Sequence, residues 1–136
     1  MSFLKGHKIA VLALDKNRAV IRYMISLGAE LIGEPKTLDD FNGVSFLIDG
    51  VGLRNLLDLG WDVATIEKKY PNLIHVSVST FGSYGPRNHW KGSELVASAM
   101  SGTLRLTGDP DRRPVKEALD ACTFHADMVA AAGAMS

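Results

Sequence analysis

Four short apolar runs, each bounded by polar residues or glycine, lie within the first 80 residues of the chain. They occupy residues 8–14, 29–32, 44–48 and 73–79. Continuous apolar runs of this length are typical of strands that are buried on both faces of a parallel sheet. The pattern therefore predicts four strands in one sheet.

Apolar residues at helical spacing separate and follow these runs. After Asn17, a candidate N-cap, they recur three and four positions apart until Gly28, which predicts a helix end. Three further helices are predicted at residues 61–70, 93–100 and 122–135, with a turn-rich connector at 102–114. The alternation favours an α/β fold, a Rossmann-like open parallel sheet with flanking helices, and the length of 136 residues fits a single domain, residues 1–136.

Ligands of open parallel sheets bind beyond the carboxyl ends of the strands. Here those ends are predicted near Asp15, Asp49 and the loop of residues 79–85. This loop combines glycine with hydroxyl side chains, so its N–H groups can face a phosphate or thioester oxygen, or it can serve only to turn the chain. Residues 50–52 read Gly-Val-Gly without the rest of a dinucleotide-binding fingerprint, which favours a turn.

Charge and composition narrow the function classes. Fifteen Lys and Arg residues balance fifteen Asp and Glu residues without a basic tract, so nothing favours nucleic acid or a membrane surface as a partner. The single cysteine, Cys122, and the lack of a leader or membrane-span pattern favour a soluble protein in a reducing compartment, and we expect the cytoplasm. The four histidines lack metal-ligand spacing, so no metal site is predicted.

Several consecutive segments match one family. Residues 70–86 read Tyr-Pro-Asn-Leu-Ile-His-Val-Ser-Val-Ser-Thr-Phe-Gly-Ser-Tyr-Gly-Pro, and residues 94–102 read Glu-Leu-Val-Ala-Ser-Ala-Met-Ser-Gly. Leu-Thr-Gly-Asp-Pro-Asp and Pro-Val-Lys follow at 106–111 and 114–116. In this order the segments resemble the family III CoA-transferases of the CaiB/BaiF type, most strongly over residues 61–135.

The resemblance implies transfer of CoA between an acyl-CoA thioester and a carboxylate, with the CoA thioester as substrate and no tightly bound cofactor. These enzymes use an Asp carboxylate that attacks the thioester, giving a mixed anhydride and then an enzyme-bound CoA thioester. The resemblance places Glu94 at an acidic position near that nucleophile. It assigns Ser79, Phe81, Gly82 and Gly85 to the loop that would bind CoA.

Two features depart from the family pattern. An ungapped alignment puts Thr123 at the position of the Asp nucleophile, while Asp120 and Asp127 lie nearby but require a shift of register. A threonine hydroxyl holds its proton too tightly to attack without an activating base. The chain is also short, without the basic CoA-contacting segment expected after Pro35 or the family's second domain, so we expect a fold truncated relative to the full family fold.

Several interpretations stay open. We favour a CoA-transferase domain without independent activity, which acts as a half-site or structural partner for a second copy or for a partner CoA-transferase domain. The alternatives are an active transferase that uses Asp120 or Asp127, and a non-catalytic module that binds CoA or acyl-CoA. A racemase of the same superfamily is disfavoured, because this chain has Ser93 and Glu94 at the two positions where the resemblance implies His and Asp in the racemases.

Overall fold

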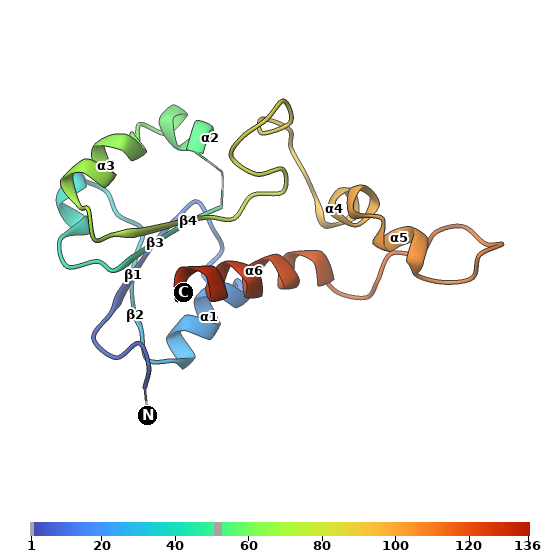
Figure 1. The fold of residues 1–136 in the computed structure, drawn as a ribbon, viewed down its shortest axis with the longest axis horizontal. Coiled ribbons are helices and arrows are strands. Elements are labelled where there is room, and N and C mark those ends of the chain that lie inside the picture. Colours follow the sequence, from blue (N-terminus) through green and yellow to red (C-terminus); the bar gives the residue numbers. More distant parts are fainter. Residues whose placement is uncertain (1, 51–52) are drawn as a thin grey trace.

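A four-stranded parallel sheet forms the centre of the molecule (Figure 1). The computed structural model describes residues 2–50 and 53–136. The strands are β1 (Lys8–Leu12), β2 (Glu30–Gly33), β3 (Phe46–Asp49) and β4 (Ile74–Ser77), in the spatial order β2-β1-β3-β4. All neighbouring strands pair in parallel. The predicted open α/β sheet is confirmed, although β1, β3 and β4 are shorter than the apolar runs that predicted them.

The inner position of β1 and β3 explains their continuous apolar sequences. Every residue of β3 and all but the first of β1 are buried. Successive side chains of a strand point to opposite faces, so each inner strand contributes to two separate cores. The edge strands β2 and β4 are only partly buried, because each has one neighbour.

Helices cover both faces of the sheet (Figure 1). On one face, α1 (Ala19–Ser26) and α6 (Ala121–Ala134) pack with the strands around Leu4, Ile9, Val11, Val20, Ile21, Met24, Ala29, Phe46, Ile48, Ala131 and Ala134. On the other, α2 (Leu53–Asp58), α3 (Val63–Lys69) and a 3-10 turn (Leu38–Phe41) surround Ala10, Leu12, Phe41, Val44, Leu47, Leu56 and Ile66. The small side chains of α6 let it lie close against α1.

Three short helical elements are absent from the sequence-based prediction. They are the 3-10 turn, α2, and α5 (Thr103–Leu106), which lies inside the predicted connector. None exceeds six residues, a length over which helical periodicity cannot be recognised. The predicted turn at residues 50–52 includes residues 51 and 52, which lie outside the described residues.

The helix α1 does not begin with the predicted N-cap, Asn17. Its N-cap is Arg18, which makes no side-chain capping bond, and not Asn17. The backbone N–H of Asn17 instead donates to the Asp15 carboxylate at 2.8 Å. At the other end, Gly28 has a φ of 101°, which only glycine adopts without strain, and ends the helix as predicted.

The segment of residues 79–120, called the arm below, extends beyond the sheet (Figure 1). It contains α4 (Glu94–Ser101) and α5, and α4 contacts α6. The remaining described residues, 2–50, 53–78 and 121–136, are called the body. No helix in the described part of the chain is long and apolar enough to cross a membrane.

Candidate functional site

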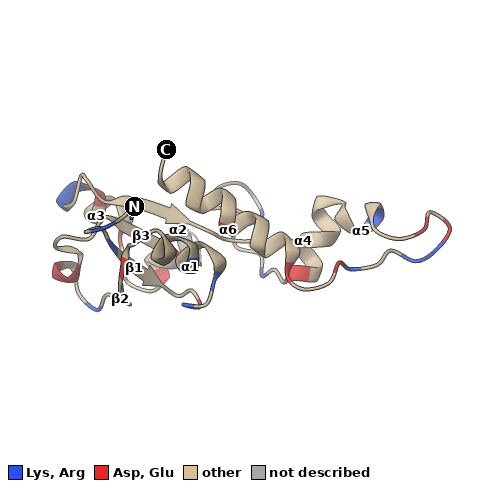
Figure 2. Ribbon diagram, turned by 90° about the horizontal axis from the view of Figure 1, so that it is seen from below, with Lys and Arg blue, Asp and Glu red and all other residues tan. Residues whose placement is uncertain are grey.

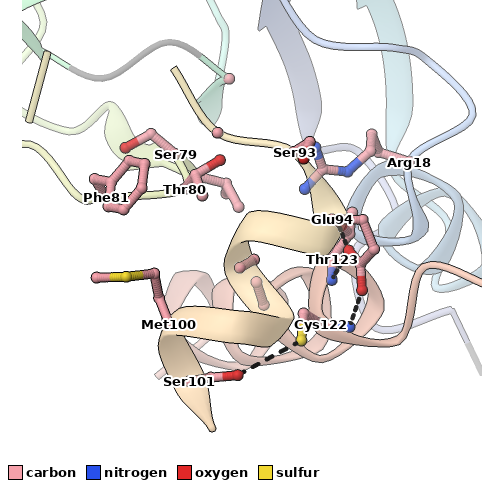
Figure 3. A pocket seen from close by; sticks show the side chains of 15 residues that line it. Arg18, Ser79, Thr80, Phe81, Ser93, Glu94, Met100, Ser101, Cys122 and Thr123 are labelled. Atoms are coloured by element: carbon pink, nitrogen blue, oxygen red, sulfur yellow. Dashed lines mark hydrogen bonds between the residues drawn. The ribbon is translucent and has the colours of Figure 1, made fainter. Parts of the chain in front are cut away.

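A cavity of about 540 Å³ lies where the carboxyl ends of β3 and β4 meet α4 and the start of α6 (Figure 3). Gly50 lines it after β3, residues 78–81 line it after β4, and Arg18 lines it from the loop before α1. The sequence predicts a ligand site at this edge of the sheet, and the cavity lies there. Residues from both the body and the arm form its walls.

The carboxylate of Glu94, the first residue of α4, reaches across to the start of α6 (Figure 3). Its Oε1 accepts the backbone N–H of Cys122 at 2.7 Å. Its Oε2 accepts the backbone N–H of Thr123 at 3.0 Å and the Thr123 hydroxyl at 2.6 Å. The N-cap residue of α6, Asp120, provides no side-chain cap, so Glu94 caps this helix from a different one.

These contacts set the charge of Glu94. Burial alone raises the pKa of its carboxyl group, but hydrogen bonds from the Thr123 hydroxyl and from two backbone amides outweigh burial. Together with the attraction of Lys116, they hold the pKa below its ordinary value. The carboxylate is therefore ionised at neutral pH, in keeping with its place at the positive end of a helix dipole.

Of the three residues predicted around the nucleophile position, Thr123 lines the cavity. Asp120 is outside the lining, with a side chain 74% exposed and its carboxylate 3.8 Å from Lys116 Nζ. Asp127 lies one turn after Thr123 in α6 and is 1% exposed. The structure thus brings Glu94 and Thr123 together in the cavity wall, whereas Asp120 and Asp127 are not among its described lining residues.

The Asp127 carboxylate is bound on two sides by the Arg18 guanidinium. Arg18 Nε donates to Oδ2 at 2.9 Å, and Nη2 donates to Oδ1 at 2.5 Å. Two parallel bonds of this kind are the strongest arrangement of an arginine and a carboxylate. The pair fixes the start of α1 to the middle of α6.

The loop after β4 divides into residues that line the cavity and residues that turn the chain. Ser79 and Phe81 line the cavity, whereas Gly82 and Gly85 do not. These two glycines have φ values of 76° and 91°, which other residues rarely adopt. The Phe81 ring packs edge-on against Trp90, with ring centroids 5.6 Å apart, and so closes the loop on itself.

The Ser79 hydroxyl oxygen is buried, and no residue in the described part of the chain forms a hydrogen bond with it. Such a group costs free energy until it meets a polar partner. It is therefore available to a polar atom of a ligand at the carboxyl edge of the sheet.

Arg18 and Cys122 also line the cavity, and sequence reasoning assigned neither to the site. The position of Arg18 after the first strand could have indicated it, because that loop also meets the carboxyl edge. The Cys122 sulfur lies 3.4 Å from Ser98 Oγ and 3.8 Å from Thr103 Oγ1, contacts that no sequence spacing indicates.

Positive charge is sparse at the site. Arg18 is the one cationic side chain among the described lining residues, and it is already bound to Asp127. Elsewhere Lys and Arg lie scattered among Asp and Glu (Figure 2). Within the described residues, no group of three or more His, Cys, Asp or Glu side chains could hold a metal ion.

The model of the CoA-transferase family III matches residues 46–136. The matched region includes β3, the loop after β4, Glu94 and Thr123, and it covers more than half of the chain. The chain therefore belongs to CoA-transferase family III.

Two curated proteins illustrate the similarity. The succinyl-CoA:glutarate CoA-transferase of Mus musculus is 38% identical over 61 residues, which make up 45% of this chain and 14% of that protein. The succinate–glutarate CoA-transferase of Agrobacterium fabrum is 34% identical over 70 residues, 52% of this chain and 18% of that protein. The aligned segments thus span less than a fifth of these relatives.

Solved structures share the fold over nearly the whole chain. A CAIB/BAIF family protein from Brucella suis superposes with a TM-score of 0.82 at 20% identity, covering 97% of this chain and 48% of that one. A hypothetical protein from Mycobacterium tuberculosis gives a TM-score of 0.81 at 16% identity, covering 97% and 49%. This chain therefore spans about half the length of these structures.

Proposed function

We propose that this chain is a domain that binds CoA esters within a protein or assembly that transfers CoA between an acyl-CoA thioester and a carboxylate. Membership of CoA-transferase family III supports the chemistry. The cavity at the carboxyl edge of the sheet, with the unpartnered Ser79 hydroxyl, supports the place where the ester binds. Succinyl-CoA and glutarate, named for the relatives, are the first compounds to test.

We further propose that the chain does not complete the transfer alone and acts with a second copy or a partner CoA-transferase domain. The observation that carries this is the charge of the cavity: Arg18 is the one cationic side chain among its described lining residues, and it is bound to Asp127, so few groups are available to hold the phosphates of CoA. Neither Asp127, which Arg18 holds, nor the exposed Asp120 is among the described lining residues. This chain covers about half of each related structure.

Calorimetry tests binding. The chain should bind CoA and succinyl-CoA, and Ser79→Ala should weaken binding of the thioester about fivefold, the effect of losing one hydrogen bond of about 1 kcal/mol. Ser26→Ala is a matched control, because the exposed Ser26 hydroxyl donates to the Tyr23 carbonyl within α1 and is not among the described residues that line the cavity. No heat at millimolar CoA would contradict the proposal.

Covalent mapping tests the role of the aspartates. The protein is incubated with succinyl-CoA, reduced with borohydride so that any enzyme thioester becomes an alcohol, and digested with trypsin. Cleavage after Lys116 releases residues 117–136, which include Asp120 and Asp127. We expect this peptide unmodified. A reduced aspartate in it would instead support the second candidate, an active transferase with Asp120 or Asp127 as nucleophile.

Association and location are part of the same proposal. Large apolar side chains of the arm are exposed, including Leu106 at 86% and Leu119 at 88%, which favours a partner surface. Light scattering should show a species larger than the monomer, and a monomer at all concentrations would count against it. The single cysteine supports a cytoplasmic location, which imaging of a tagged chain would test.

A further inference from the structure

We propose that Glu94 supplies the carboxylate that attacks the acyl-CoA thioester, in the place of the aspartate that the family pattern expects at position 123. The inference rests on the proposed function, because a CoA ester must first bind in the cavity. It adds the identity of the reacting group, which would come from α4 instead of α6.

The position of Glu94 in the cavity fits this role. Glu94 is the only carboxylate among the described residues that line the cavity. Its Oε2 lies 2.6 Å from Thr123 Oγ1, so a carboxylate oxygen stands one hydrogen bond away from the side chain at the expected nucleophile position. Figure 3 shows the two side chains meeting between α4 and α6, across the cavity from residues 79–81. A carboxylate therefore lies at the start of α6, although it belongs to a residue of α4.

The charge and hydrogen bonding of the Glu94 carboxylate also suit a nucleophile. The Glu94 carboxylate is already ionised, so it can attack without giving up a proton, whereas the Thr123 hydroxyl would first have to lose one. Oε2 accepts two hydrogen bonds and Oε1 accepts one. Each carboxylate oxygen has about two acceptor sites, so Oε1 retains a lone pair for the attack. The donors from α6 hold the group in one orientation, which favours reaction over free rotation.

The proposed step balances without an added proton or redox partner. A Glu94 oxygen bonds to the thioester carbonyl carbon, the carbon–sulfur bond breaks, and its electron pair leaves with the CoA thiolate. The product is a mixed anhydride of Glu94 and the acyl group. The thiolate then attacks the Glu94 carbonyl carbon, the acyl carboxylate leaves, and CoA remains attached to Glu94 as a thioester.

The tryptic map separates Glu94 from the aspartates. Cleavage after Lys91 and Arg105 releases residues 92–105, in which Glu94 is the only carboxylic side chain. After incubation of the full chain with succinyl-CoA and borohydride reduction, we expect the glutamate of this peptide to be converted to an alcohol. Because the wild-type protein is mapped, the result does not depend on any variant folding.

Three variants sharpen the test. Glu94→Gln keeps the size of the side chain but cannot form an anhydride, so it should lose the modification while still binding CoA in calorimetry. Glu67→Gln is the matched control, because Glu67 is exposed on α3, and it should retain the modification. Thr123→Val removes one of the three hydrogen bonds that orient the Glu94 carboxylate, so it should lower the yield of the modification without abolishing it.

Each remaining outcome overturns the inference. These outcomes are an unmodified peptide 92–105 in a wild-type chain that binds CoA, a modification confined to residues 117–136, and retention of the modification in a folded Glu94→Gln protein. The first leaves the proposed function standing. Absence of CoA binding would instead remove the proposed function itself.

Discussion

The body and the arm of this molecule are stabilised in different ways. All residues of the two hydrophobic clusters belong to the body, whereas the only buried residue of the arm is Ser98. The arm is joined to α6 through contacts of α4, among them the hydrogen bonds of Glu94. Burial of apolar side chains therefore stabilises the sheet, whereas a few polar contacts hold α4 against α6 at the wall of the cavity. The candidate site depends on the weaker of these two kinds of interaction.

The largest difference in stability between the body and the arm should come from a Leu→Ala substitution made once in each. Leu47 in β3 is fully buried, and Leu106 in the arm is 86% exposed. Leu47→Ala leaves a cavity in the core and should lower the free energy of unfolding by about 3 kcal/mol or more. Leu106→Ala should change it by less than about 0.5 kcal/mol. Urea titrations measure both, and equal losses would refute the division into body and arm.

Two ion pairs offer the next contrast. Arg18→Met leaves the Asp127 carboxylate, 1% exposed, without a counter-charge and should cost about 3 kcal/mol. Lys69→Met removes the partner of Asp39 in a pair whose side chains are 45% and 80% exposed, and it should cost less than about 1 kcal/mol. Thermal unfolding followed by circular dichroism compares them. A small effect of Arg18→Met would mean that the buried pair does not hold α1 to α6.

The sequence predicts what depends on local pattern. The inner strands were found because both of their faces are apolar, and the helix end at Gly28 because glycine tolerates its backbone conformation. The register that puts Thr123 at the expected nucleophile position depends on consecutive segments and needs no structure. The sequence also predicted a ligand site at the carboxyl edge of the sheet, where the cavity lies, since topology alone determines which strand ends meet.

Contacts between distant segments could not be predicted in this way. Arg18 and Asp127 are 109 residues apart, and Glu94 and Thr123 are 29 apart. No periodicity links such pairs, because they meet only after the sheet and its covering helices have assembled. The resemblance placed Glu94 near the expected nucleophile position, but no pattern in the sequence indicated that its carboxylate caps α6.

The cap provides a third test, of intermediate size. Glu94→Gln weakens the three hydrogen bonds to α6 and should lower the free energy of unfolding by about 1–2 kcal/mol at neutral pH. Glu67→Gln, at an exposed site on α3, should have almost no effect. Urea titration of the two variants measures the difference, and identical midpoints would show that the cap contributes nothing to stability.

The same group gives a pH dependence with a defined sign. The pKa of Glu94 is lower in the folded chain than its ordinary value. Its contribution is therefore fully present above the pKa of the unfolded chain, about 4.3, and is lost as the pH falls through the folded value. The stability difference between the wild type and Glu94→Gln should shrink below about pH 4. A difference that grows on acidification would reverse the assignment.

A substitution at Gly102, with the smallest expected effect, tests whether the arm unfolds separately from the body. Gly102 ends α4 with a φ of 84°, and an added Cβ would meet no atom within 4 Å, so Gly102→Ala introduces backbone strain of about 1 kcal/mol without a clash. Because few contacts join α4 to the body, we expect this strain to lower hydrogen-exchange protection in α4 while protection of β1 and β3 stays unchanged. Gly102→Asn should show a smaller loss, since asparagine tolerates this conformation better. An equal loss of protection in the strands would mean that the arm and the body unfold as one unit, and the cavity would then be as rigid as the sheet.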